Sequence, residues 1–182
     1  MDSEKRYDCI CDADENYELI LPIAHYALIN SNYNGKSRPK LVIHGLGSCV
    51  ALILYDNKNK VYAMSHILLA DFKNSDINNI KKYPHKYVFS SVKNLLEEIL
   101  NHGAEKSNIR AIIVGGAKIF QNQFNDIGKK NVKILKEELE KFNIKIEKED
   151  TGGTQGRTLI YDTNNNSILI HYALESEFRR LI

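Results

Sequence analysis

From about residue 40 onward, the chain is built from short apolar runs separated by polar stretches. Runs of this length that are rich in Val, Ile and Tyr are typical of β-strands. The predicted strands are residues 40–46, 50–55, 60–69, 109–114, 144–149, 157–162 and 167–172. The sequences DNKNK at 56–60 and TNNN at 163–166 predict turns that join neighbouring strands into hairpins.

Two further segments place apolar side chains three and four residues apart, which is the spacing of one helix face. The stripes are Val92, Leu95, Leu96, Ile99 and Leu100 within residues 86–102, and Val132, Leu135, Leu139 and Phe142 within residues 127–142. Gly103 stands where the first helix is expected to end, and 71–84 is expected to be a polar loop. This element order predicts an α/β layered sandwich in which helices pack on one mixed β-sheet.

The first part of the chain differs from the rest. Residues 1–16 are polar and charged, and the apolar stretch 19–29 is broken by Pro22. We therefore interpret residues 1–39 as an N-terminal extension, partly disordered or contributing an added strand, and 40–182 as the folded domain.

Composition excludes several classes of protein. A net charge of +2 over 182 residues does not indicate nucleic-acid binding, and no apolar run reaches the roughly 20 residues that span a bilayer. The start lacks a secretory signal, so a cytoplasmic location is expected. The cysteine count of three is odd, which argues against a disulfide framework, and no zinc-ligand spacing occurs, so neither metal nor cofactor is expected.

The segment Gly45-Leu46-Gly47-Ser48-Cys49 lies between two apolar runs and carries the strongest chemical signal. Close glycines permit a sharp turn, at which a thiol can project from the fold beside backbone N–H groups of Gly47 and Ser48. Such groups can hold an oxyanion. The alternative is that Cys49 is a buried, small apolar residue. A dinucleotide fingerprint is excluded because Val50 stands where its third glycine is needed.

A nucleophilic thiol needs a base, and His66 is the candidate among six histidines. It lies in the strand that returns from the 56–60 turn. Counting outward from a turn centred at 57–58 pairs residue 49 with residue 66, so the thiol and the imidazole would meet across the hairpin. The alternative is a core histidine whose ring bonds to backbone.

Two glycine-rich stretches end predicted strands. They are Gly115-Gly116 and the segment DTGGTQGR, which contains Gly152, Gly153 and Arg157. Either stretch can be a plain turn, or it can line a cleft that a substrate backbone approaches closely.

Taken in order, these motifs resemble CheD, the chemoreceptor glutamine deamidases of bacterial and archaeal chemotaxis. The matching segments are GLGSCVALILYD at 45–56, MSHILLAD at 64–71, HGA at 102–104, VGGAKIF at 114–120, IGKKNV at 127–132 and EDTGGTQGR at 149–157. The resemblance covers about residues 40–172.

The resemblance implies that Cys49 is the nucleophile and His66 its base, in a hydrolysis of protein glutamine to glutamate and ammonia through a thioester. It implies a layered α/β fold similar to that of toxin deamidases, and no cofactor. The implied partners are the cytoplasmic helices of chemoreceptors, as substrate, and a CheC-type phosphatase of the phosphorylated response regulator.

The chain departs from the family at the threonine that usually stands five or six residues before the cysteine and completes the triad. Ile43 and His44 occupy those positions, which leaves His44 as a possible orienting group. Three other functions stay open: a weakly active binding module that regulates the CheC-type phosphatase, a different Cys–His acyl-transfer enzyme, and a structural domain with an inert thiol.

Overall fold

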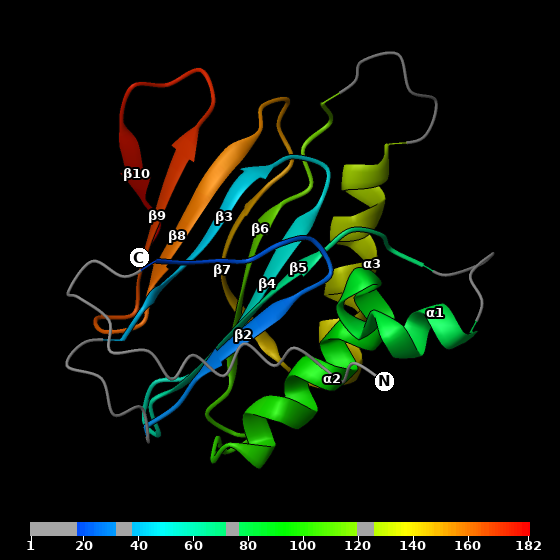
Figure 1. Ribbon diagram of the computed structural model, residues 1–182, viewed down its shortest axis with the longest axis vertical. Coiled ribbons are helices and arrows are strands. Elements are labelled where there is room, and N and C mark those ends of the chain that lie inside the picture. The colour runs from blue at the N-terminus through cyan, green and yellow to red at the C-terminus, as the bar shows by residue number, and fades with distance from the viewer. Residues whose placement is uncertain (1–17, 32–37, 72–76, 120–125) are drawn as a thin grey trace.

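The computed structural model describes residues 18–31, 38–71, 77–119 and 126–182, which form two facing five-stranded sheets and a layer of helices (Figure 1). The first sheet has the order β1 (Glu18–Ile20), β3 (Lys40–Leu46), β8 (Arg157–Asp162), β9 (Ser167–Tyr172) and β10 (Phe178–Arg180). The second has the order β2 (Tyr26–Ile29), β5 (Val61–Ile67), β4 (Val50–Asp56), β6 (Arg110–Gly115) and β7 (Lys145–Thr151).

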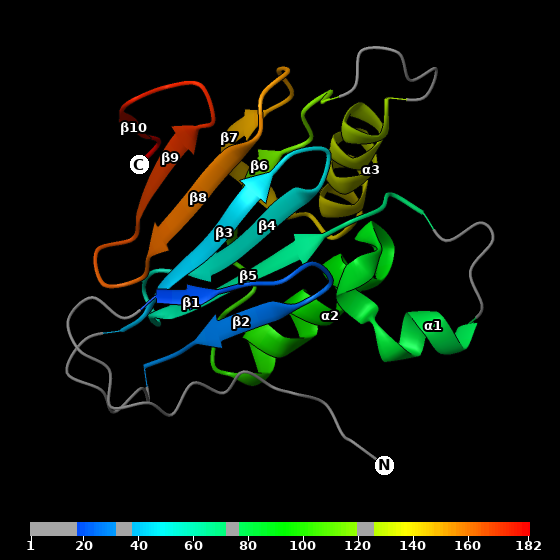
Figure 2. The same cartoon turned by 45° about the horizontal axis from the view of Figure 1, so that its top comes forward.

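Both sheets are mixed. In the first, β1 runs parallel to β3, and in the second, β6 runs parallel to β7, while the remaining neighbours are antiparallel. The longer helices, α2 (Val88–Asn101) and α3 (Ile127–Lys141), cover the face of the second sheet that points away from the first (Figure 2). The short helices are α1 (Ile77–Lys82) and the 3-10 turn η1 (Pro84–Lys86).

The α/β layered architecture is confirmed, but the expectation of one mixed sheet was wrong. The chain leaves the first sheet at Leu46, and residues 47–49 carry it into the second sheet, where β4 begins. Every residue of β4 and β5 is buried because one face packs on the first sheet and the other on helices. In β8, by contrast, buried positions alternate with half-buried ones, as expected for a sheet with one covered face.

The predicted elements lie close to the observed ones. The strand 157–162, the strand 167–172 and the turn between them are confirmed, and Gly103 follows α2 with a φ of 100°. Helix α1 lies in the segment that was expected to be a polar loop, and strand β10 was not predicted. No helix in the described ranges has the length and apolar character required to cross a membrane.

Residues 18–29 add one strand to each sheet. Strand β1 pairs with β3 and strand β2 pairs with β5, so this stretch connects the two layers at one edge. The polar segment 1–16 lies outside the described residues, and a domain boundary at residue 40 stays a prediction.

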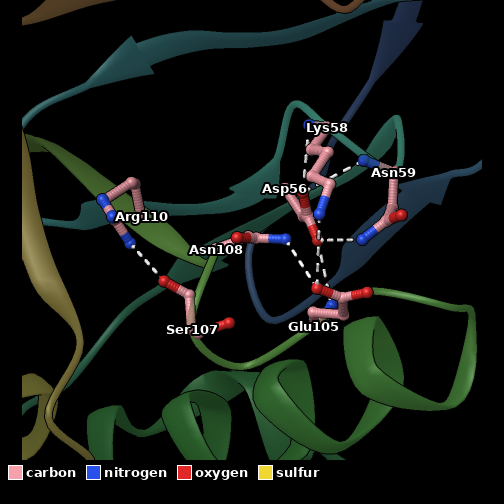
Figure 3. Close-up of polar contacts among 7 residues, drawn as sticks. All are labelled: Asp56, Lys58, Asn59, Glu105, Ser107, Asn108 and Arg110. Carbon is pink, nitrogen blue, oxygen red and sulfur yellow. Dashed lines mark hydrogen bonds and ion pairs between the residues drawn. The ribbon is translucent and has the colours of Figure 1, made fainter.

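A buried carboxylate fixes the turn between β4 and β5 (Figure 3). Asp56 is fully buried and accepts hydrogen bonds from the backbone N–H groups of Lys58, Asn59 and Glu105, at 3.0, 3.1 and 2.9 Å. The Asn59 side chain donates a further bond of 2.7 Å. The turn held by these contacts spans residues 57–60, and Asp56 lies opposite Val61. This pairing sets the register of the whole hairpin.

Candidate active site

The loop of residues 47–49 lies where the chain passes from one sheet to the other, and all three of its backbone carbonyls are anchored. The carbonyl of Gly47 accepts from the Ala117 N–H, and that of Cys49 accepts from the Gly116 N–H, both at 2.8 Å. The carbonyl of Ser48 accepts from the side-chain amide of Asn131, also at 2.8 Å. The backbone of this loop is therefore held in one conformation from the side of its carbonyl groups.

The backbone N–H groups of the same loop are available. Within the described ranges, those of Gly47 and Ser48 have no hydrogen-bond acceptor, and that of Cys49 lies against its own thiol. Gly47 and Ser48 are half-buried, and Cys49 is 9% exposed. Unpaired donors held rigidly beside a sulfur atom are suited to bind a negatively charged oxygen.

Gly115 is required by the close approach of the Cys49 loop. Its φ is 111°, and a Cβ atom at this position would lie 2.4 Å from the Cys49 carbonyl oxygen. Gly116 has a φ of 70° and packs against the first turn of α3, where a Cβ would lie 2.3 Å from Val132. Gly115, a predicted oxyanion or substrate-binding residue, is buried, and the space beside it is filled by the Cys49 loop.

His66 does not pair directly with Cys49, so the predicted hairpin register was wrong by two residues. The turn occupies residues 57–60, and His66 stands opposite Ala51. Cys49 lies two residues before Ala51, directly ahead of β4. Side chains two residues apart share a sheet face, and both of these residues belong to the core between the sheets. A diagonal pair of this kind is still within reach of a long or aromatic side chain.

The ring of His66 is oriented by backbone. Its Nδ1 atom lies 3.2 Å from the carbonyl oxygen of Leu21, and both residues are buried. A carbonyl can only accept a hydrogen bond, so Nδ1 carries the proton of the neutral ring, and Nε2 keeps its lone pair. Nε2 has no hydrogen-bond partner in the part of the chain that the structure describes.

Both groups of the pair are neutral near pH 7. Burial lowers the pKa of His66; the bond to Leu21 opposes this shift and a charge on His25 adds to it. Burial also raises the pKa of the Cys49 thiol above its ordinary value of 9.0, and its own backbone N–H opposes that shift. The resting site therefore holds a thiol and an imidazole base, and the thiol loses its proton only during attack.

His44 does not take the orienting position that the sequence suggested. Its side chain is exposed, and Nδ1 lies 3.5 Å from the hydroxyl of Thr158 on the neighbouring strand. The preceding residue, Ile43, faces the core between the sheets, and alternation along β3 places His44 on the opposite face. The ring of His66 contacts Leu21 instead.

Arg157, a predicted substrate-binding residue, is 2% exposed. Its guanidinium forms an ion pair with Asp150, donates to the Asp150 carbonyl at 3.0 Å and donates to the Gly152 carbonyl. Tyr172 donates its hydroxyl to the same carboxylate at 2.7 Å. The arginine therefore holds the glycine loop from inside the fold.

The glycine loop of residues 152–153 is docked on the end of β6. Gly152 and Gly153 have φ values of 79° and 74°, which favour glycine. The Gly152 N–H donates to the Gly115 carbonyl, and the Gly153 carbonyl accepts from the Lys118 N–H, both at 2.9 Å. The loop thus lies next to the residues that anchor the Cys49 loop.

Sequence reasoning missed Asn131, which bridges the two halves of the site. Its side-chain amide donates to the carbonyls of Ser48 and Leu68, at 2.8 and 3.0 Å, and so ties the loop of Cys49 to the end of the strand that carries His66. The residue is fully buried, and its Oδ1 atom has no partner among the described residues. A polar residue on the buried side of an amphipathic helix was the signal that could have identified it.

Two cavities flank the first turn of α3. One, of about 460 Å³, is lined by glycines 116, 152 and 153 and by four lysines: Lys118, Lys129, Lys133 and Lys136. The other, of about 400 Å³, is lined by Asn131 and by residues 69–71. Each cavity is lined by one residue that bonds to a carbonyl of the 47–49 loop, Gly116 in the first and Asn131 in the second, and neither cavity is lined by Cys49 or His66.

Comparison with protein families gives one match. A family described as CheD chemotactic sensory transduction matches residues 68–172. The matched range includes the glycine loops and Asn131, and it begins just after His66.

Curated relatives extend the similarity toward the N-terminus. The chain is 38% identical over 142 residues to a probable chemoreceptor glutamine deamidase CheD from Methanosarcina barkeri, with 78% of this chain and 92% of the relative aligned. It is 40% identical over 138 residues to a probable chemoreceptor glutamine deamidase CheD from Methanococcus vannielii, with 75% of this chain and 86% of the relative aligned. It is 35% identical over 151 residues to the chemoreceptor glutamine deamidase CheD of Thermotoga maritima, with 83% and 89% aligned. Any alignment that covers 78% of a 182-residue chain includes Cys49 and His66.

Proposed function

Because the chain belongs to the CheD family, we propose that it is a chemoreceptor glutamine deamidase, a hydrolase that converts glutamine side chains of receptor proteins to glutamate and ammonia. One observation carries this proposal. The part of the chain that aligns with the deamidases contains the Cys49 thiol, the imidazole of His66 oriented by Leu21, and the unpaired N–H groups of Gly47 and Ser48.

The first half of the proposed reaction forms a thioester. Nε2 of His66 takes the proton of the Cys49 thiol as the sulfur attacks the carbon of the glutamine carboxamide. The N–H groups of Gly47 and Ser48 hold the oxyanion of the tetrahedral intermediate. The imidazolium then protonates the departing amino group, the carbon–nitrogen bond breaks, and ammonia leaves.

The second half releases the product. Water enters the place of ammonia, and Nε2 of His66 removes a proton as the water oxygen attacks the thioester carbon. The same N–H groups hold the second oxyanion. The carbon–sulfur bond breaks, the sulfur recovers its proton from the imidazolium, and glutamate leaves. The chain's own residues and one water molecule account for every atom.

A neutral resting pair supports general-base catalysis. A buried thiol with a raised pKa is not a thiolate at rest, and a histidine with a lowered pKa remains able to accept a proton well below pH 7. The low resting reactivity of the sulfur protects it from oxidation and favours reaction only when an amide occupies the site.

Further features of the proposal rest on the family. These are a cytoplasmic location, the cytoplasmic helices of chemoreceptors as substrate, a CheC-type phosphatase as second partner, and a likeness of the fold to toxin deamidases. Gly153 is exposed in the loop that lies next to the anchors of the Cys49 loop, and this exposure supports access by a protein substrate.

The test is deamidation of a purified receptor cytoplasmic fragment, followed by mass spectrometry of its glutamine-containing peptides. Wild-type protein is expected to convert amide to acid, and Cys49→Ala and His66→Ala are expected to lose at least about a thousandfold in kcat. His44→Ala is the matched control, because this histidine is exposed and its Nδ1 atom lies 3.5 Å from the Thr158 hydroxyl. Deamidation that persists in Cys49→Ala would refute the proposal.

The alternative of a binding module is favoured by one observation: Ile43 and His44 occupy the two positions at which the family usually has a threonine. A protein of this kind would bind the CheC-type phosphatase and alter its rate, while the wild type leaves every receptor glutamine unchanged. Measuring both activities on the same preparation separates the two functions.

A further inference from the structure

A short stretch of chain, residues 21–25, holds both the ring and the backbone of His66. The Leu21 carbonyl accepts from Nδ1 at 3.2 Å. The Ala24 N–H donates to the His66 carbonyl at 2.8 Å, and the His66 N–H donates to the His25 carbonyl at 3.0 Å. Two adjacent residues thus bond to one residue of β5, as in a β-bulge, which is a device that redirects a side chain.

The Leu21 carbonyl is itself fixed from both sides. The Leu21 N–H donates to the Val42 carbonyl at 2.8 Å, which continues the pairing of β1 with β3 in the first sheet. After Leu21, the chain makes a turn in which the His25 N–H lies 3.3 Å from the Pro22 carbonyl, and Ala24 adopts a φ of 66°. Strand β2 then pairs with β5 in the second sheet.

The other groups near the ring do not compete for Nδ1. Ile43 has no polar side-chain atom, and His44 points to the exposed face of the first sheet. The titratable groups that face His66 are Cys49, on the same sheet face, and His25, whose Nδ1 lies 2.9 Å from the Ile23 carbonyl. Within the described residues, Leu21 is the acceptor that Nδ1 has.

We propose that residues 21–25 are the positioning element of the base, and that the Leu21 carbonyl keeps the proton of His66 on Nδ1 so that Nε2 faces the thiol as a free base. This proposal rests on the proposed function and deepens it. The N-terminal segment then completes the active site, and it does so through backbone, where a side-chain hydroxyl or carboxylate serves in other Cys–His and Ser–His enzymes.

A backbone ester at position 22 tests the contact. Nonsense suppression can insert α-hydroxyisovalerate in place of Pro22, which turns the Leu21 carbonyl into an ester carbonyl and so into a weaker acceptor. Proline has no N–H, so the ester removes no hydrogen-bond donor that the wild type possesses. The matched control is Pro22→Val, which carries the same side chain on an ordinary amide.

Two measurements are made on wild type, Pro22→Val and the ester. Long-range nitrogen–proton NMR correlations of the His66 ring, assigned against His66→Ala, report the tautomer directly. Deamidation kinetics report kcat and KM. Wild type and Pro22→Val are expected to hold the proton on Nδ1 with kcat within about twofold of each other. The ester is expected to populate the other tautomer and to lose about tenfold in kcat with KM unchanged.

A second pair of variants uses ordinary residues. Ala24→Gly suits the positive φ and should keep the tautomer and kcat, whereas Ala24→Val places a β-branched side chain in a conformation that it strongly disfavours. The valine variant should displace the turn, shift the tautomer and lower kcat at least about tenfold.

The outcomes separate this proposal from the proposed function. If the ester and Ala24→Val keep Nδ1 protonated and match their controls in kcat, the positioning role is wrong and the deamidase stands. If no preparation deamidates but the ester shifts the tautomer, the contact stands and the deamidase fails.

Discussion

Replacing Asn131 with alanine should damage catalysis far more than it damages folding. The side-chain amide forms the direct bridge between the loop of Cys49, through the Ser48 carbonyl, and the segment after His66, through the Leu68 carbonyl. The substitution removes both bonds at once. It does not alter the thiol, the imidazole or the N–H groups of the loop.

The expected loss of stability follows from the two acceptors. Each net hydrogen bond is worth about 1 kcal/mol, and Ser48 and Leu68 are half-buried, so water can replace part of what is lost. Removal of the unpartnered Oδ1 atom offsets a further part. We therefore expect a decrease of about 1–2 kcal/mol in the free energy of unfolding.

The expected loss of activity is larger because the loop positions both the sulfur and the oxyanion donors. A displacement of about 1 Å in a catalytic group can cost about a hundredfold in rate. The carbonyls of Gly47 and Cys49 keep their anchors at Ala117 and Gly116, so the loop shifts without unfolding. We expect kcat/KM to fall about thirtyfold to a hundredfold, mostly through kcat.

Urea denaturation and receptor deamidation on the same preparations measure the two effects. Asn94→Ala is the matched control, because this asparagine lies on α2 and, among the described residues, its side chain bonds to the Ser90 carbonyl of its own helix alone, at 2.7 Å. It should lose about 1 kcal/mol or less and keep its activity. If Asn131→Ala deamidates as fast as Asn94→Ala, the bridge does not position the site and the reasoning is refuted.

Three further predictions concern buried groups: a glycine, an ion pair and a histidine. Gly115→Ala should lose about 3 kcal/mol or more of unfolding free energy because of its positive φ and the contact with the Cys49 carbonyl, whereas Gly156→Ala, with open space around it, should be nearly neutral in thermal melts; equal losses would contradict the packing argument. Arg157→Met should cost about 3–5 kcal/mol because the Asp150 carboxylate loses its buried partner, and a variant that melts like wild type would show that the pair is dispensable. Burial lowers the pKa of His85 to about 3, so between pH 6.5 and 3 this histidine binds a proton only in the unfolded chain. The free energy of unfolding should therefore decrease as the pH is lowered through that window, by up to about 1.4 kcal/mol per pH unit. Urea titrations of His85→Gln should show a smaller decrease over the same window.

The fold was predictable from sequence as far as local pattern carries it. The strand limits 157–162 and 167–172 follow from alternation and a turn rich in asparagine, and α3 follows from its apolar stripe. The division into two sheets was not predictable in this way, because the pairing of β3 with β8 links residues more than a hundred positions apart. The unbroken apolar run of residues 50–55 was the signal available in the sequence for a strand covered on both faces.

The candidate site divides along the same line. Cys49 and His66 were identifiable because thiol and imidazole chemistry has few carriers in this chain. The predicted pairing of Cys49 with His66 was wrong because Asp56 holds residues 57–60 in the turn. One hydrogen bond to Asp56 comes from the backbone of Glu105, which follows α2 in the sequence. The Leu21 carbonyl left no signal at all, since every residue has one, and only the fold shows which carbonyl meets the ring.

The two halves of the site are supported from different parts of the molecule, and this separates their roles. The nucleophile loop is held by the end of β6 and by α3, whereas the base is held by residues 21–25. Loss of support on the first side moves the oxyanion donors, which act in both formation and hydrolysis of the thioester. Loss of support on the second side disturbs proton transfer, which also recurs in both steps. Because Asn131 bonds to both the Ser48 carbonyl and the Leu68 carbonyl, its effect should not add simply to that of a change at either side.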